Sequence, residues 1–227
     1  MTKTLKILYR QAPATTIICL LIIVTYLITA LQSHSFVDNL QNSSLAEHMV
    51  LSMPAMESSP LGPLRSIGTL FLHQGADHLI VNTVMLFLIG REIERSLGHA
   101  IFTGTFFTGG LGSSALVSYL QPYVPTVGAS GAIFSLMVLL IGVAALKRMD
   151  LRAPIIYVLI NVAFSFISPG VSWAGHMGGF GIGVVLLLAI RRSLRFLKRV
   201  LYFMLIALII VMLWLVYSQP GLIHSFL

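Results

Sequence analysis

The sequence predicts an all-α protein that crosses a membrane several times, and its composition carries that prediction. Apolar residues make up 57% of the 227 residues, charged residues make up only 9%, and the mean hydropathy is +0.93. Soluble proteins carry about 25% charged residues, and so few charged side chains cannot cover a soluble surface of this size. The composition therefore excludes a cytosolic enzyme, a secreted module and a disordered tail.

Seven apolar runs are long enough to cross a bilayer as helices, because the bilayer core takes about 20 helical residues and lipid requires internally paired backbone groups. They cover residues 14–32, 77–95, 100–119, 129–146, 153–168, 174–190 and 200–217. The first run follows basic residues, as a secretory signal does, but it is long for a signal and no small-residue cleavage site follows. We therefore expect a short cytoplasmic N-terminus at 1–13, a membrane domain at 14–192, and an additional helix with a tail at 193–227.

The positions of the basic residues predict the orientation. With the N-terminus inside, 13 of the 14 Lys and Arg residues fall in inner segments and only Arg65 falls outside, as the positive-inside rule requires. We therefore expect an inner, cell-membrane protein with a cytoplasmic N-terminus and an outer C-terminus. The net charge of +7 is explained by topology and lipid headgroups, so no nucleic-acid partner is expected. The inner set is Lys3, Lys6, Arg10, Arg91, Arg95, Lys147, Arg148, Arg152, Arg191, Arg192, Arg195, Lys198 and Arg199.

Residues 33–76 form the longest irregular stretch between the predicted spans, and they fall outside. Apolar residues alternate there with turn formers, which is typical of a segment resting in the outer membrane interface. A plain solvated loop is the alternative. The apolar members are Met49, Val50, Leu51, Met53 and Met56.

Ser130 lies at the predicted outer end of the fourth span, between Gly128 and Gly131. Pro122 and Pro125 keep the preceding loop non-helical, and the glycines let another backbone or a ligand approach closely. The start of a helix also leaves backbone N–H groups unpaired, and these groups can hold an oxyanion if the hydroxyl is a nucleophile. A helix-capping or packing serine is the alternative.

His176 lies at the outer end of the sixth span, beside glycines that recur every four residues at Gly175, Gly179 and Gly183. Such a stripe allows very close helix packing. Close packing is able to bring His176 within hydrogen-bond reach of Ser130, where it would act as a general base and then as a general acid. The alternatives are an incidental histidine beside a packing stripe, or a haem ligand.

His78 and Asn82 share one face at the outer end of the second span, because they are four residues apart. Both side chains donate hydrogen bonds, and asparagine is a poor zinc ligand, so the pair suits an oxyanion hole better than a metal site. The adjacent Asp77 caps the helix, faces water, or completes a triad. We favour a serine–histidine dyad, with no metal and no cofactor.

These three motifs together, in this order and on these spans, resemble the rhomboid family of intramembrane serine proteases over about residues 60–190. The resemblance implies that Ser130 is the nucleophile and His176 the base. It also implies that His78, Asn82 and the Ser130 backbone N–H form the oxyanion hole. The implied substrates are transmembrane proteins, which enter laterally near the fifth span and are cut in or beside their membrane-spanning helix.

Further positions are similar to the family's pattern. Arg65 resembles the arginine of its first-loop Trp-Arg motif, with Leu64 in place of the tryptophan. Glu94 resembles the acid at the inner end of span two, and Phe134 takes the place of an aromatic that packs on the catalytic histidine. The family core has six spans. The seventh span is therefore interpreted as structural or as a surface for an adaptor.

Two other functions fit parts of the pattern. A rhomboid-like pseudoprotease would bind membrane clients without cutting them, although Ser130 and His176 are both present. A haem- or metal-binding membrane protein would use His73, His78 and His176, and would leave the motif around Ser130 without a role.

Overall fold

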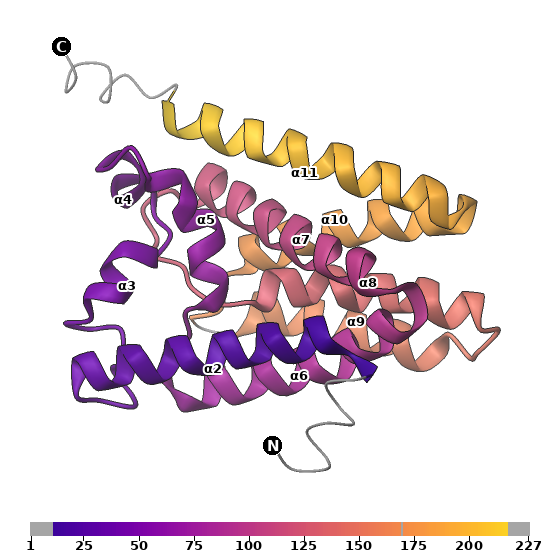
Figure 1. The fold of residues 1–227 in the computed structure, drawn as a ribbon, viewed down its shortest axis with the longest axis horizontal. Coiled ribbons are helices and arrows are strands. Elements are labelled where there is room, and N and C mark those ends of the chain that lie inside the picture. The colour runs from indigo at the N-terminus through magenta and orange to yellow at the C-terminus, as the bar shows by residue number, and fades with distance from the viewer. Residues whose placement is uncertain (1–10, 169, 218–227) are drawn as a thin grey trace.

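A computed structural model describes residues 11–168 and 170–217, and seven long helices dominate this part of the chain (Figure 1). Six of them begin and end within two residues of a predicted span and the seventh begins six residues early, so the all-α membrane bundle is confirmed. The N-terminal residues Lys3, Lys6 and Arg10, and the tail from 218, lie outside the described residues. The long helices are α2 (Pro13–Ser33), α6 (Gly75–Leu97), α7 (His99–Leu120), α8 (Ser130–Leu146), α9 (Arg152–Ile167), α10 (Trp173–Arg192) and α11 (Leu194–Tyr217).

The helices are those of an integral, multi-pass membrane protein. Among the described residues, α2, α7, α10 and α11 are each long and apolar enough to cross a bilayer alone. α8 and α9 are apolar but shorter, with 17 and 16 residues. α6 has 23 residues, and the charges in its last two turns run from Arg91 to Arg95. Of these, α8 is largely buried, whereas α9 leaves most of its surface exposed.

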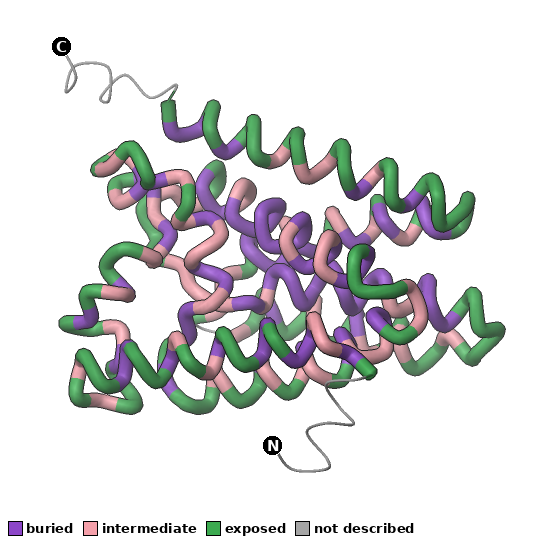
Figure 2. Tube along the Cα trace, viewed as in Figure 1, coloured by how far each residue is buried: buried purple, intermediate pink, exposed green. Residues whose placement is uncertain are grey.

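The centre of the bundle is formed by α7, α8 and α10, which pack on one another. Every residue from 131 to 139 in α8 is buried, and Figure 2 shows buried residues concentrated in this middle region. α2 packs on α6 along one side, and α11 packs on α7 and α10 along the opposite side (Figure 1). α2 begins and α11 ends at opposite ends of the bundle, as an odd number of spans requires.

The segment at 33–76 is more regular than the irregular stretch that the sequence predicted. It forms short helices, and Leu51, Met53 and Met56 are buried against side chains of α7 and α11. These three residues therefore belong to the protein core, whereas Met49 and Val50 are only partly buried. The short helices are α3 (Ser44–Met49), α4 (Met53–Glu57), η1 (Gly62–Leu64), α5 (Arg65–Gly68) and η2 (Thr69–Phe71).

The fully buried Glu94 carboxylate joins the end of α6 to the start of α2. Its two oxygens accept hydrogen bonds from the backbone N–H groups of Ala14 and Thr15, at 2.9 and 2.8 Å, and from the Thr15 hydroxyl at 2.6 Å. It also contacts the ring of His99. The first turn of a helix has no intrahelical partners for its N–H groups, so the carboxylate supplies them and complements the positive end of the helix.

We predict that Glu94→Ala lowers the free energy of unfolding by about 2–3 kcal/mol, because it leaves buried charge-assisted donors unpaired. Thermal unfolding of the purified protein in detergent measures the loss. The matched control is Glu92→Ala two residues earlier, since Glu92 and Lys147 form a half-exposed ion pair. Such pairs contribute at most about 1 kcal/mol. Equal losses in the two variants would contradict a structural role specific to Glu94.

Candidate active site

Ser130 is the first residue of α8, and a glycine with a positive φ angle sets its position. Gly128 has φ +119°, a backbone conformation that side chains disfavour, and a Cβ atom there would lie 2.8 Å from the His78 ring. Only glycine therefore lets the His78 ring lie against the backbone just before the serine. The N-cap position falls on Ala129. The alternative that Ser130 is a helix-capping serine is therefore excluded.

The loop before Ser130 is held by the 51–69 segment through hydrogen bonds between parts of the chain that are far apart in sequence. A short antiparallel bridge pairs two residues by bonds of 3.2 and 2.9 Å, and three further bonds of 2.6–2.9 Å flank it. The segment that the sequence suggested to be a surface feature therefore supports the loop that leads into Ser130. The bonded residues are Leu51 with Thr126, Met53 with Pro122, and Thr69 with both Thr126 and Gly128.

His73, which the sequence suggested only as a haem or metal ligand, also contacts this loop. Its Nε2 accepts a hydrogen bond from the Ala129 N–H at 3.5 Å, and its Nδ1 faces the Phe71 carbonyl at 3.4 Å. Burial, with a smaller contribution from His78, lowers the pKa of His73 to about 3. The ring therefore stays neutral near pH 7 and keeps one nitrogen as an acceptor.

His176 lies in the first turn of α10, and its depth follows from the start of that helix. The Ser172 side chain caps the helix by accepting a hydrogen bond from the Gly175 N–H at 3.2 Å, so the helix begins at Trp173. His176 is only 9% exposed.

Glycines bring α10 into backbone contact with α8 next to this histidine. A Cβ atom on Gly179 would overlap the carbonyl oxygen of Gly131, and one on Gly183 would lie 2.9 Å from the carbonyl oxygen of Ser135. The glycine stripe is therefore filled by the neighbouring backbone, which fixes the separation of Ser130 and His176 on the two helices.

The His176 ring is held on two sides. The Phe134 ring stacks on it with centroids 4.3 Å apart and planes 22° from parallel. Its Nδ1 lies 2.7 Å from the Ser165 hydroxyl of α9. Among the described residues, no hydrogen bond joins the Ser130 hydroxyl to His176. Catalytic hydrogen bonds are often long without substrate and tighten only in the complex.

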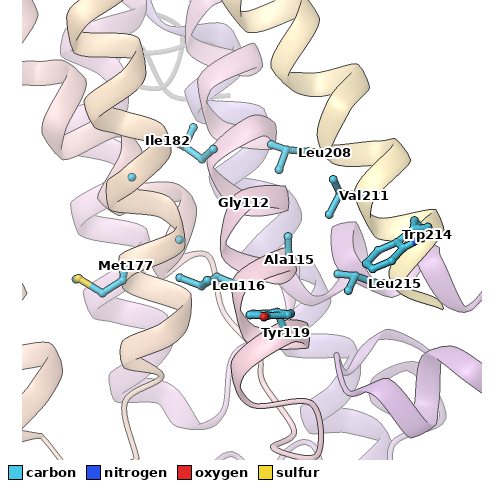
Figure 3. Close-up of a pocket in the computed structure, with 12 residues that line it drawn as sticks. Gly112, Ala115, Leu116, Tyr119, Met177, Ile182, Leu208, Val211, Trp214 and Leu215 are labelled. Atoms are coloured by element: carbon cyan, nitrogen blue, oxygen red, sulfur yellow. The ribbon is translucent and has the colours of Figure 1, made fainter. Parts of the chain in front are cut away.

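A polar cavity of about 740 Å³ brings the candidate residues together at the end of the bundle where α6, α8 and α10 begin. A second hollow of about 420 Å³ lies between α7, α10 and α11 and is apolar, with Trp214, Leu208 and Met177 on its walls (Figure 3). The polar cavity is therefore the candidate active site. The predicted residues on its wall are His78, Asn82, Ser130, Phe134 and His176, with Asp77 beside them.

The oxyanion candidates adopt a defined arrangement. The Asn82 amide nitrogen donates to the His78 carbonyl at 3.0 Å, which uses one of its two hydrogens. The His78 ring lies beside the His73 ring, with centroids 4.9 Å apart. Asp77 is exposed, and the Nδ1 of His176, where a triad acid would bind, faces Ser165 instead.

Two predicted structural residues lie away from the catalytic candidates. The Arg65 guanidinium donates to the carbonyl oxygens of Glu47 and Val50, at the end of α3, and so fixes the fold of the 33–76 segment. Leu64 beside it is 60% exposed. Glu94 lies at the opposite end of α6 from His78.

The fold and cavity define a polytopic helical membrane protein with a serine and a histidine in a polar chamber, and comparison with known proteins identifies its family. The family model described as the Rhomboid domain matches residues 62–193. This match covers more than half of the chain. The chain therefore belongs to the rhomboid family.

Individual relatives agree with this assignment. The Bacillus subtilis (strain 168) protein named Rhomboid protease GluP is 32% identical over 164 residues, covering 68% of this chain and 32% of that protein. Rhomboid-like protease 3 of Toxoplasma gondii is 30% identical over 181 residues, covering 72% of this chain and 64% of that protein. RHOMBOID-like protein 5 of Arabidopsis thaliana is 33% identical over 132 residues, covering 54% and 42%. The chain thus spans less than two thirds of the length of each.

We predict that Gly179→Ala lowers the free energy of unfolding by about 3 kcal/mol, because the methyl group forces α10 away from Gly131. The matched control is Gly181→Ala on the same helix, where a Cβ atom meets nothing within 4 Å. That variant should gain up to about 1 kcal/mol from helix propensity. Thermal unfolding in detergent compares the two. A neutral Gly179→Ala would show that α8 and α10 are not held at backbone contact.

Proposed function

We propose that this protein is an intramembrane serine endopeptidase that cuts transmembrane protein substrates in or near their membrane-spanning helix. Ser130 is the nucleophile and His176 the general base of a dyad. The observation that carries the proposal is that Ser130, His176, His78 and Asn82, from three helices, line one polar cavity. Membership of the rhomboid family and relatives named as proteases support it.

The chemistry follows from the groups in the cavity. The Ser130 hydroxyl attacks the peptide carbonyl carbon, and its proton passes to Nε2 of His176. The new C–O bond gives a tetrahedral oxyanion. When the C–N bond breaks, His176 returns the proton to the leaving amine. Water from the cavity then hydrolyses the ester by the same route and frees Ser130.

The oxyanion is stabilised by donors near Ser130. The Ser130 backbone N–H lies at the start of α8, where an intrahelical partner is lacking, and Asn82 has a second amide hydrogen to offer. His78 adds a ring nitrogen. The starts of α6, α8 and α10 all lie at this end of the bundle, so the positive ends of three helix dipoles favour developing negative charge.

The membrane setting constrains the substrate and the orientation. A peptide bond inside an intact helix is shielded, so the substrate must unwind locally, which favours segments with glycine, serine or proline. The described basic residues cluster at the bundle end opposite the cavity, apart from Arg65. By the positive-inside rule, the cavity then opens toward the outer side and the N-terminus is cytoplasmic. The packing of α11 on α7 and α10 supports a structural role for the seventh span.

We predict that Ser130→Ala abolishes both fluorophosphonate labelling and proteolysis by the purified protein, because it removes the hydroxyl that we propose as the nucleophile. In-gel fluorescence after labelling measures the first, and cleavage of a membrane-embedded reporter helix measures the second. Ser135→Ala is the control, since it removes a fully buried hydroxyl from the same helix. That control should label as the wild type does. Undiminished labelling and cleavage by Ser130→Ala would disprove the proposal.

We predict a partial loss for Asn82→Ala. Removing one oxyanion donor lowers kcat by about 10²–10³, while the dyad remains intact. Reporter cleavage by Asn82→Ala should therefore be slow but measurable above the Ser130→Ala background. Wild-type kcat in Asn82→Ala would exclude Asn82 from the oxyanion hole.

A further inference from the structure

The structure assigns Ser165 as the residue that orients the base: we infer that its hydroxyl accepts the Nδ1 proton of His176 and so leaves Nε2 free to take the proton of Ser130. This inference rests on the proposed function, because it concerns how that dyad is prepared for proton transfer. Ser165 would be a positioning residue, since it acts through His176 and does not touch the reacting atoms.

Ser165 is a buried polar residue on a helix that is otherwise mostly exposed. α9 carries only two buried residues among its described positions, Val158 and Ser165. A helix that turns most of its surface to lipid should bury its apolar side chains first, because a buried polar group is costly unless it is paired. Ser165 is 2% exposed, and His176, its partner at 2.7 Å, comes from another helix. The burial is therefore explained by that pair.

The hydrogen bonds determine which atom carries each proton. A serine hydroxyl has one hydrogen and two acceptor positions. The Ser165 oxygen lies 2.7 Å from the carbonyl oxygen of Asn161, one turn earlier, and only the hydroxyl can donate in that bond. Its single hydrogen is therefore used. The 2.7 Å contact with His176 is then a hydrogen bond only if Nδ1 donates.

The consequence for the base is direct. A neutral imidazole with a proton on Nδ1 has an unprotonated Nε2, which is the form required to accept the proton of Ser130. Phe134 fixes the plane of the ring by stacking, and Ser165 fixes its rotation in that plane. Asn161, Ser165 and His176 thus form a chain of hydrogen bonds that polarises toward the imidazolium as it forms.

A hydroxyl suits this place better than a carboxylate. An ionised acid on a helix that faces lipid would carry a large desolvation penalty, whereas a paired hydroxyl carries little. The orienting effect is correspondingly weaker than that of a buried aspartate, because a dipole replaces a full charge.

The test measures inactivation of the full-length protein in detergent by a fluorophosphonate probe, separating kinact from KI. Ser165→Ala should lower kinact about tenfold and leave KI within about twofold, because probe binding is untouched while the base is misoriented. Ser165→Thr restores a hydroxyl and should recover most of kinact. Ser135→Ala is the control, since its hydroxyl also donates to a carbonyl one turn back, that of Ala132, without contacting His176.

The outcomes separate this inference from the proposed function. Loss of labelling in Ser130→Ala, with wild-type kinact in Ser165→Ala, would overturn the role of Ser165 and leave the protease intact. An equal fall of kinact in Ser165→Ala and Ser135→Ala would also overturn it, because the loss would then reflect general packing. Labelling that persists in Ser130→Ala would overturn the proposed function itself.

Discussion

The backbone contact between α8 and α10 is the constraint on which the site depends. Gly179 and Gly131 meet without a side chain between them, and Gly183 meets the next turn of α8 at Ser135. Helix axes are normally 8–10 Å apart when side chains separate them. Because both candidate catalytic residues lie in first helical turns beside this contact, their separation is set by main-chain geometry and not by side-chain packing, which fluctuates more.

The site also requires that the loop before Ser130 has a fixed conformation. A segment that is distant in the sequence holds this loop in place. The loop before the serine has little regular structure of its own, so its backbone groups need partners elsewhere. The 51–69 segment supplies them, and the burial of Met53 and Met56 against α7 and α11 holds that segment in place. The long connection between α2 and α6 is in this way part of the scaffold of the site.

Hydropathy alone predicted six of the long helices to within two residues, because a bilayer-spanning helix leaves a continuous apolar signal. It missed the first six residues of α11, which include Arg195, Lys198 and Arg199. The motifs around Ser130, His176 and His78 also indicated which residues share a cavity, since they fall in the first turns of helices that run the same way. The packed state of the 33–76 segment was not predicted, because contacts between distant segments leave no periodic pattern. Ser165 was missed although a polar pair, Asn161 and Ser165, stands out in an apolar run. Its partner depends on how α9 is rotated, which one sequence does not reveal.

Because α9 buries few residues, its motion determines how long the His176 ring keeps one orientation. The bond between Ser165 and His176 spans two helices, and α9 contributes little else to the protein core. A displacement of α9 away from α10 by more than about half an ångström lengthens this 2.7 Å bond beyond the usual hydrogen-bonding range. Collective helix displacements occur over microseconds to milliseconds, whereas side-chain rotations are far faster. The His176 ring therefore keeps its orientation for as long as α9 stays packed against α10. The lifetime of this orientation is set by the motion of a helix and not by the rotation of a side chain.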